Sequence, residues 1–246
     1  MKLEKSVVIG DLHIPYHSPS AIKKVIQFIS YFKPDRIFIN GDLIDCLDIS
    51  RFETPLERHD SLAEEIEEAK YFLLTLRSAA PKARIQYIFG NHEFRLANYL
   101  RRNARELYGL KGLSLEEQLN CKDLDIEIYN NGTKENFYKY GNLLVGHFDR
   151  VNKDSGMTAK NLLHDKGMSL IQGHTHRLGS SYKRDFDGQR GAWEGGCLCD
   201  LSPQYVNMPN WNPGFLTIHT DHKTGFFKVT TVEIIEGQII YGDKII

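Results

Sequence analysis

Five short apolar runs in this sequence each end at a glycine that is followed directly by an Asp, Asn or His. Carboxylate, amide and imidazole groups are common protein ligands of divalent metal ions. Their repetition at the ends of successive apolar runs indicates a metal site. The five segments are Gly10-Asp11-Leu12-His13, Gly41-Asp42-Leu43-Ile44-Asp45, Gly90-Asn91-His92-Glu93, Gly146-His147 and Gly173-His174-Thr175-His176.

Each segment taken alone has an ordinary explanation, because Gly-Asp is common in turns and a single His after a strand is usually exposed or hydrogen-bonded. Five such segments at corresponding points are hard to explain by turn chemistry. In an open α/β sheet, ligands gather beyond the carboxyl ends of the strands, so the five loops are expected to converge on one crevice. In extended backbone, residues two apart point to one side, so Asp11 is expected to pair with His13, and His174 with His176.

The elements that must position these loops can be read from the apolar periodicity. The first half predicts parallel strands at 6–9, 36–39 and 84–89, joined by right-handed helical crossovers. One helix is expected to be capped by Ser20 and to run through Phe32. A second is expected from Ser61 to about Ala80, closed by Pro81.

The second half of the chain is richer in strands. Short strands are expected at 142–145 and 169–171, with a helix at 160–166 between them. Three antiparallel strands are expected at 215–218, 226–232 and 238–241, separated by turns at 222–225 and 236–237. No linker divides the chain, so residues 1–246 are predicted to form a single layered α/β domain.

In order and residue type, the five segments resemble the motifs of the calcineurin-like metallophosphoesterase superfamily, from about residue 6 to residue 176. The resemblance implies the fold class, an α/β protein built as a two-sheet β-sandwich flanked by α-helices. It also implies two divalent metal ions, manganese first, with iron, zinc or nickel as alternatives. Carried over position by position, it implies Asp11, His13 and His176 at one metal, Asn91, His147 and His174 at the other, and Asp42 bridging both.

The same resemblance implies a mechanism. Two ions would share a bridging hydroxide near neutral pH and stabilise the charge that grows on the phosphoryl oxygens. His92 matches the family's histidine that stabilises or protonates the leaving oxygen. Asp45 matches the carboxylate that orients this histidine in the protein-phosphatase branch, and its alternative is a solvated loop carboxylate.

This chain differs from the protein-phosphatase branch at positions that bear on the choice of substrate. Where that branch has an Arg that grips the phosphate this chain has Cys46, and where it has Gly-Gly this chain has Phe148-Asp149. The His-x-His pair at 174–176 is similar to phosphodiesterases and nucleases, although Arg95 is similar to the phosphatases. We therefore expect a phosphodiesterase acting on a nucleotide or nucleic-acid phosphodiester. The alternatives are a phosphomonoesterase or Ser/Thr protein phosphatase-like enzyme, and a non-catalytic scaffold, which the full set of ligand residues disfavours.

Two basic regions, one with aromatic residues, are candidates for substrate selection. They can hold a nucleotide or a single strand by phosphate contact and stacking, or they are simply a solvated helix face and a glycine-rich surface loop. The segment 207–213 has the composition of a loop that can cover the crevice. The residues are Arg95, Arg101, Arg102 and Arg105, then Arg177, Lys183, Arg184, Arg190, Trp193, Tyr205 and Trp211.

The composition of the chain bears on its partners, its location and its cysteines. The 31 basic and 32 acidic residues give a net charge of -1, which argues against broad attraction to nucleic acid or membranes but allows a local basic patch. No signal segment or membrane-length apolar run is visible, which predicts a cytoplasmic protein without a membrane partner, of unspecified oligomeric state. Four free thiols are expected. Cys197 and Cys199 lack a second pair at zinc-site spacing, so they are predicted to be small buried residues in a strand rather than ligands.

Overall fold

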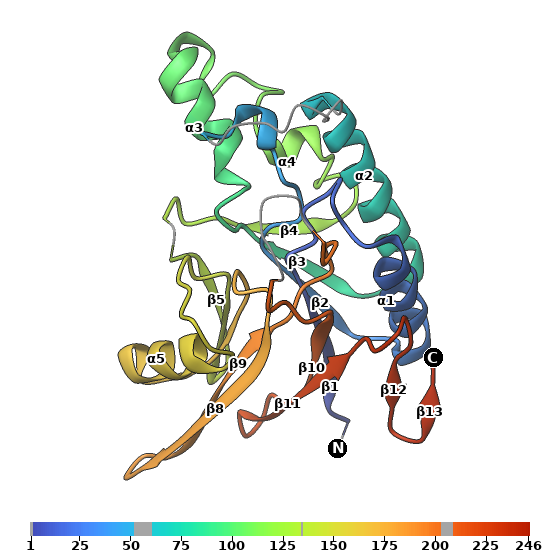
Figure 1. Cartoon of the computed structure of the whole chain (residues 1–246), viewed down its shortest axis with the longest axis vertical. Coiled ribbons are helices and arrows are strands. Elements are labelled where there is room, and N and C mark those ends of the chain that lie inside the picture. Colours follow the sequence, from blue (N-terminus) through green and yellow to red (C-terminus); the bar gives the residue numbers. More distant parts are fainter. Residues whose placement is uncertain (1, 52–60, 134, 203–208) are drawn as a thin grey trace.

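Two β-sheets form the centre of the molecule, and helices lie outside them (Figure 1). The structure is a computed structural model that describes residues 2–51, 61–133, 135–202 and 209–246. Helices α1 (Pro19–Phe32) and α2 (Leu62–Ala79) lie side by side along the larger sheet, and α5 (Met157–Lys166) lies on the smaller one. This arrangement confirms the predicted α/β class with two sheets flanked by helices.

The larger, six-stranded sheet joins a parallel half to an antiparallel edge. The first three strands and the fourth run parallel, as crossover helices require, and the C-terminal pair adds antiparallel strands beside the first. The short fourth strand was not predicted. In spatial order the strands are β11 (Phe226–Glu233), β10 (Gly214–Asp221), β1 (Glu4–Ile9), β2 (Arg36–Asn40), β3 (Arg84–Ile88) and β4 (Ile126–Tyr129).

The smaller, five-stranded sheet ends in a long hairpin. Its strands are β5 (Phe137–Tyr140), β6 (Leu143–Gly146), β7 (Ser169–Gln172), β9 (Gly188–Gly195) and β8 (Leu178–Asp185), in spatial order. The β8–β9 hairpin occupies the segment that was considered as a glycine-rich surface loop, and that interpretation was wrong. Much of the hairpin is solvated, so it lacks the apolar alternation by which a buried strand is recognised.

The remaining elements lie at the ends of the molecule. The expected strand at 238–241 is shorter than predicted and pairs only with the last strand, in a separate two-stranded hairpin. Among the described residues, no helix combines the length and hydropathy needed to cross a bilayer. These elements are α3 (Phe94–Asn103), α4 (Leu115–Gln118), β12 (Ile240–Tyr241), β13 (Lys244–Ile245) and the 3-10 helices Leu47–Ile49 and Arg105–Leu107.

Helix ends follow the local sequence. The side chain of Ser18 accepts a hydrogen bond from the backbone of Ala21, so Ser18 caps α1 and the prediction of Ser20 was wrong. The reason is Pro19, whose fixed φ suits the first helical position and moves the cap one residue before it. Ser61, where the second helix was expected to begin, caps α2 in a reciprocal capping box with Glu64.

Three hydrophobic clusters correspond to the three contacts between layers. The first lies between α1, α2 and the larger sheet, the second between the two sheets, and the third under α5. Alternate residues of β1 belong to the first and second clusters, because Val7 faces the helices and Val8 faces the smaller sheet. Trp193 lies in the second cluster with 7% exposure, so its interpretation as a stacking platform for substrate was wrong.

Phe28 is the centre of the contact between α1 and the larger sheet. It is 0% exposed, and its ring stacks on Phe32 and meets Phe215 and Tyr241 edge-on, with centroids 4.9–5.2 Å away. We expect Phe28→Ala to lower the free energy of unfolding in urea by about 3–5 kcal/mol, because it removes a buried ring and leaves a cavity. Tyr71→Ala, on the exposed side of α2, is the control, with an expected change within about 0.5 kcal/mol. Equal stability of the two variants would contradict this packing.

Candidate metal centre

The five glycine-led loops meet beyond the carboxyl ends of β1, β2, β3, β6 and β7, where the two sheets adjoin. Hydrogen bonds join the loops both within the larger sheet and between the two sheets. The N–H of Asp11 donates to the carbonyl of Gly41 over 3.0 Å. The side-chain amide of Asn40 donates to the carbonyl of Gly146, also over 3.0 Å, and so links the two sheets. The predicted convergence of the loops is therefore present.

The glycines are needed because other chain atoms occupy the place of a side chain. A Cβ on Gly41 would lie 2.4 Å from Nδ1 of His147, and Gly41 also has a φ of +82°. A Cβ on Gly90 would lie 2.4 Å from Oδ1 of Asp42. The loops approach this closely only without side chains at these two positions.

The backbone of the ligand pairs is not extended, so the predicted conformation was wrong, although the predicted pairing of Asp11 with His13 is present. Asp11, His13, His174 and His176 have φ values between 51° and 68°, in the left-handed region. Non-glycine residues rarely adopt this conformation, and it concentrates at functional sites. As a result Asp11 and His13 point into one group, while His174 and His176 point into two different ones.

The first group consists of Asp11, His13 and His176, all buried. Nε2 of His176 lies 3.3 Å from Oδ1 of Asp11 and 3.0 Å from Nε2 of His13. These are the three residues predicted for the first metal, and their donor atoms lie within 4.8 Å of one another.

The second group is centred on Nε2 of His147. This atom lies 3.1 Å from Oδ2 of Asp42, 3.1 Å from Oδ1 of Asn91 and 3.2 Å from Nδ1 of His174. Oδ2 of Asp42 is also 3.7 Å from Nε2 of His13 in the first group. The structure thus brings all seven predicted ligand residues together, with Asp42 between the groups.

Each of the four imidazoles turns one nitrogen inward and has its other nitrogen against a protein group. This pattern is typical of metal-ligating histidines, whose outer N–H is held so that the inner lone pair faces the ion. The outer contacts are His147 Nδ1 to the Asn40 carbonyl (2.9 Å), His13 Nδ1 to Asp45 Oδ1 (3.1 Å), His174 Nε2 to Asp149 Oδ1 (3.2 Å) and His176 Nδ1 to Cys199 Sγ (3.8 Å).

The donor set fits divalent cations. With the outer nitrogens of His13 and His176 donating, their inner nitrogens face each other as lone pairs only 3.0 Å apart. Such an arrangement is repulsive unless positive charge lies between them. Oxygen and nitrogen donors of this kind suit hard or borderline divalent ions.

The carboxylates favour positive charge at this place. Burial alone would lower the pKa of His147 and His176, but Asp42 beside the former and Asp11 beside the latter raise each pKa to about 10. Burial and the neighbouring His147 lower the pKa of His174 to about 4. Burial would raise the pKa of Asp42, but the adjacent imidazoles hold it well below its usual range. A buried pair of carboxylates is compatible with folding only when cationic groups face it.

His92 lies beside the two groups. Its Nδ1 is 3.0 Å from Oδ1 of Asp45, and its Nε2 is 3.7 Å from Oδ2 of Asp42 and 3.0 Å from Nη2 of Arg95. Burial would lower the pKa of His92, but the two carboxylates raise it. Asp45 is 7% exposed, so the alternative of a solvated loop carboxylate was wrong. Burial would raise the pKa of Asp45, but its contacts with His13 and His92 lower it strongly.

Glu93 is a site residue whose role sequence reasoning missed. Its buried carboxylate accepts hydrogen bonds from the backbone N–H groups of Asp42 (3.0 Å), Leu43 (2.8 Å) and Gly90 (2.7 Å), and from the hydroxyl of Tyr87 (2.6 Å). It therefore ties the second loop to the third and holds the backbone of Asp42. The available signal was an acidic residue at the end of the third segment, Gly90-Asn91-His92-Glu93. The outer contacts Asn40, Asp149 and Cys199 were missed as well, because nothing local marks them.

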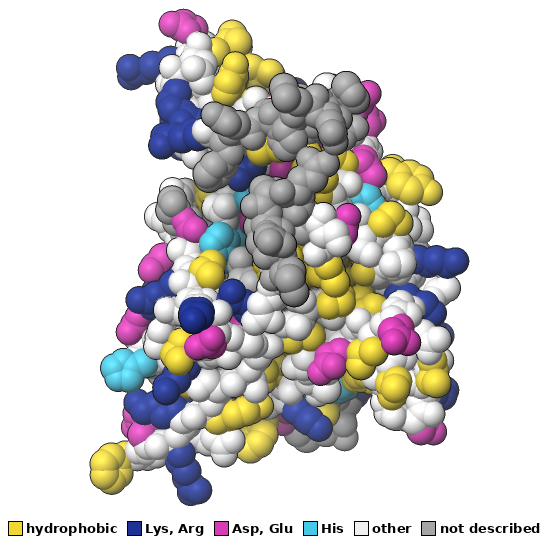
Figure 2. Space-filling view, viewed as in Figure 1, with side chains coloured by type: hydrophobic (Ala, Val, Ile, Leu, Met, Phe, Trp, Pro, Cys, Tyr) yellow, Lys and Arg dark blue, Asp and Glu magenta, His cyan; other side chains and the backbone are white. Residues whose placement is uncertain are grey.

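The two predicted basic regions both begin beside the site and lead to opposite ends of the molecule, one along α3 and the other along the β8–β9 hairpin (Figure 1). Lys and Arg side chains gather over the projecting helix α3 (Figure 2), where Arg101 and Arg102 are exposed. Lys183 and Arg184 are exposed on β8, while Arg190 is paired with Asp185 and Arg177 bonds to loop carbonyls.

The described end of the segment 207–213 contacts the first group. The ring of Trp211 lies 4.4 Å from that of His176, and the N–H of Asn212 donates to the carbonyl of His176 over 2.8 Å. Tyr205 and residues 207–208 lie outside the described residues. The described residues 209–213 of this segment therefore lie against the first group.

Cys197 and Cys199 are buried free thiols, as predicted, but they do not lie in a strand. Gly196, with a φ of +75°, ends β9 and turns the chain towards β1. Each cysteine then makes an isolated bridge, Cys197 with Pro213 and Cys199 with His17. This path brings the thiols to the side of the first group.

Comparison with known proteins identifies the family. Residues 5–194 match the model of the calcineurin-like phosphoesterases. The chain belongs to this family. It is 30% identical to the Gene 54 protein of Mycobacterium phage D29 and 29% identical to that of Mycobacterium phage L5, each over 251 aligned positions covering 96% of this chain and 95% of the relative. The fold is similar to that of vacuolar protein sorting 29 from Cryptosporidium parvum, with a TM-score of 0.50, 13% identity and coverage of 100% and 99% of the two chains. Family membership confirms the resemblance and implies phosphoester chemistry with divalent metals.

Gly90 provides a test of the close approach of the loops. We expect Gly90→Ala to weaken Mn²⁺ binding by at least about tenfold in calorimetric titration, because the added methyl group meets Asp42 and displaces its carboxylate. Gly195→Ala is the control, since its Cβ would meet only the carbonyl of Gln172, at 3.2 Å. Wild-type affinity in the Gly90 variant would show that the loops do not meet in this way.

Proposed function

We propose that this chain is a metal-dependent phosphodiesterase that hydrolyses a nucleotide or nucleic-acid phosphodiester. The observation that carries the proposal is the place of one carboxylate oxygen, Oδ2 of Asp42. It lies 3.1 Å from Nε2 of His147 in one group and 3.7 Å from Nε2 of His13 in the other. A carboxylate that faces two sets of metal donors suits a two-ion centre, and such centres are typical of phosphatases and nucleases.

The seven donor residues divide into two sets. Asp11, His13 and His176 would hold one ion, Asn91, His147 and His174 the other, and Asp42 would contribute to both. When bound, the two ions would acidify a water molecule and neutralise negative charge on the phosphoryl oxygens. Manganese is the first choice, and iron, zinc and nickel are alternatives, since oxygen and imidazole donors accept all four.

His92 would act on the leaving group. Asp45 at Nδ1 sets the orientation of the ring, so that Nε2 faces the site beside Asp42. Nη2 of Arg95 can only donate to Nε2, so Nε2 carries a proton only after the guanidinium turns from the ring to the substrate. The raised pKa favours this protonated ring, which can then give its proton to the leaving oxygen as the ester bond breaks. Arg95 places a permanent positive charge beside the same atom, where negative charge develops.

The type of ester follows from the groups that face the phosphate. A phosphomonoester carries one more negative charge than a diester and benefits from an additional cationic clamp. At the position where the protein-phosphatase branch has its clamping Arg, this chain has Cys46, whose side chain is fully buried. Burial also raises the pKa of the Cys46 thiol, so this residue offers no charge to a substrate. This favours a diester.

The basic surface on α3 supports a nucleotide or nucleic-acid substrate. Helix α3 begins directly after the third segment, Gly90-Asn91-His92-Glu93. Its first turn therefore lies near the proposed metal centre, and the rest of the helix extends away from it. The guanidinium of Arg101 lies over the exposed ring of Tyr108, 5.5 Å from its centroid. Surfaces that combine cations with aromatic rings bind single strands through phosphate contacts and stacking. The exposed basic residues are Arg101 and Arg102 on α3, and Arg105 and Lys111 in the segment that follows it.

The proposed centre predicts that Asp42 is essential. In Mn²⁺, Asp42→Ala should reduce hydrolysis of bis-p-nitrophenyl phosphate by at least about 100-fold, because the bridging donor is lost. Circular dichroism should stay that of the wild type, chelator should abolish the wild-type rate, and the exposed Asp123→Ala is the matched control. Full activity in the Asp42 variant would refute the mechanism. Faster turnover of p-nitrophenyl phosphate than of the diester would favour the phosphomonoesterase alternative.

The role of His92 can be separated from metal binding by the leaving group. His92→Ala should slow diesters with alkyl leaving groups by about 10²–10⁴-fold, because these need a proton. Nitrophenyl esters should be slowed much less, since nitrophenolate leaves without one. Steady-state rates on both substrates measure the difference, with His164→Ala, exposed on α5, as the control. An equal loss on both classes would remove the acid role.

A further inference from the structure

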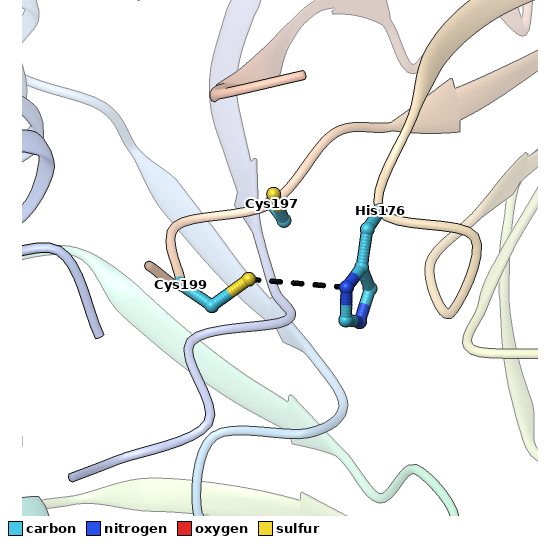
Figure 3. A group of neighbouring side chains, drawn as sticks. All are labelled: His176, Cys197 and Cys199. Carbon is cyan, nitrogen blue, oxygen red and sulfur yellow. Dashed lines mark hydrogen bonds between the residues drawn. The ribbon is translucent and has the colours of Figure 1, made fainter. Parts of the chain in front are cut away.

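The outer contact of His176 differs from those of the other three inward-facing histidines. The outer nitrogens of His13, His147 and His174 face oxygen atoms, two carboxylates and a backbone carbonyl. Nδ1 of His176 faces Sγ of Cys199 at 3.8 Å, and the sulfur points towards the ring (Figure 3). In the established pattern for metal-ligating histidines, the group at this place sets the tautomer and the ring orientation.

We propose that Cys199 is a positioning residue that holds His176 in the tautomer and orientation required for metal binding. The proposal rests on the function proposed above, in which Nε2 of His176 is a ligand. Nε2 is 3.3 Å from Oδ1 of Asp11 and 3.0 Å from Nε2 of His13, so its lone pair must face the ion. The ring proton is then on Nδ1, and the sulfur of Cys199 is its acceptor.

The sulfur is held on a backbone that is tied to the ligand loop itself. The N–H of Leu198 donates to the carbonyl of Asp11 over 3.1 Å, and the carbonyl of Leu198 accepts from the N–H of Ser18 over 2.8 Å. Cys199 is 3% exposed and forms a bridge with His17. The distance between the sulfur and the first ligand group is therefore fixed by main-chain hydrogen bonds on both sides.

The surroundings of the ring restrict it from other sides. The ring of Trp211 meets that of His176 at a centroid distance of 4.4 Å. Sγ of Cys197 lies 3.7 Å from the carbonyl of Asn212 and can donate to it. The sulfur of a thiol is an acceptor, so Sγ of Cys199 can accept from Nδ1 of His176.

The competing interpretation is a separate site for a thiophilic cation. His176, Cys197 and Cys199 place donor atoms within 4.8 Å of one another, and sulfur with imidazole suits zinc. A cation on Nδ1, however, requires a ring without a proton on either nitrogen, because Nε2 already faces the first metal group. It also brings another positive charge close to two divalent ions. These costs favour the hydrogen-bonded arrangement.

The experiment compares Cys199→Val with Cys199→Ser in the full chain. Valine fills the place of the sulfur with an apolar branch and removes the acceptor, and serine keeps an acceptor for the Nδ1 proton. In calorimetric titration with Mn²⁺, we expect two ions in the wild type and a 10–100-fold weaker affinity for one of them in the valine variant, roughly the effect of losing such a contact. The serine variant should recover most of the affinity. The control is Cys121→Val, which changes a buried thiol in the cluster between α1, α2 and the larger sheet and should bind Mn²⁺ as the wild type does.

Cobalt spectra separate the two interpretations. If Cys199 positions His176 and does not bind the metal, the spectrum of the Co²⁺-loaded wild type should show no sulfur-to-cobalt charge-transfer band. A band that disappears in Cys199→Val would overturn the proposal in favour of direct thiolate ligation. Wild-type Mn²⁺ affinity in a folded valine variant would also overturn it, and Cys199→Ala gives the same test if valine prevents folding. A wild type that binds no ions would refute the proposed function itself, whereas the other results concern Cys199 alone.

Discussion

The arrangement of the loops at the candidate metal centre depends on two carboxylates, Asp11 and Asp42, that are almost completely buried between the sheets. Burying a charged carboxylate is very unfavourable unless charged and hydrogen-bonding partners replace water. Here the partners are imidazoles from the smaller sheet and backbone N–H groups from neighbouring loops. The loops must therefore approach closely, and the glycine at the start of each loop permits this. Glu93, which ties the loop of Asp42 to the third loop, serves the same requirement.

The strained backbone is a consequence of this crowding. Asp11, His13, Asp42, His174 and His176 all have left-handed φ values, a conformation that is unfavourable for non-glycine residues by of order 1–3 kcal/mol each. The surrounding layers supply the stability that keeps them there. Strands β1, β2 and β3 are buried on both faces, with helices on one side and the smaller sheet on the other. A rigid double layer can therefore hold unfavourable loop conformations at its edge.

The sequence was most informative where structure is locally encoded. Strands β1, β2 and β3 and helices α1 and α2 were predicted with small errors at their ends, because their apolar periodicity is regular. The β8–β9 hairpin was missed since it is largely solvated, and Trp193 was misinterpreted because its burial depends on the other sheet. Within the site, the buried state of Asp45 was left open, since a loop carboxylate carries no mark of its own burial.

By itself, the sequence determined the donor types, their order along the chain and the glycines that precede them, because these are properties of short segments. Only the tertiary structure decided that left-handed rather than extended backbone sends His174 and His176 into the two groups that the resemblance implied, and that Cys199 rather than an oxygen faces the outer nitrogen of His176. The physical reason is the long sequence separation between the residues that meet at the site. His13 and His176 are 163 positions apart and meet at 3.0 Å. Such contacts are set by how two sheets pack and how left-handed loops turn, which no local pattern encodes.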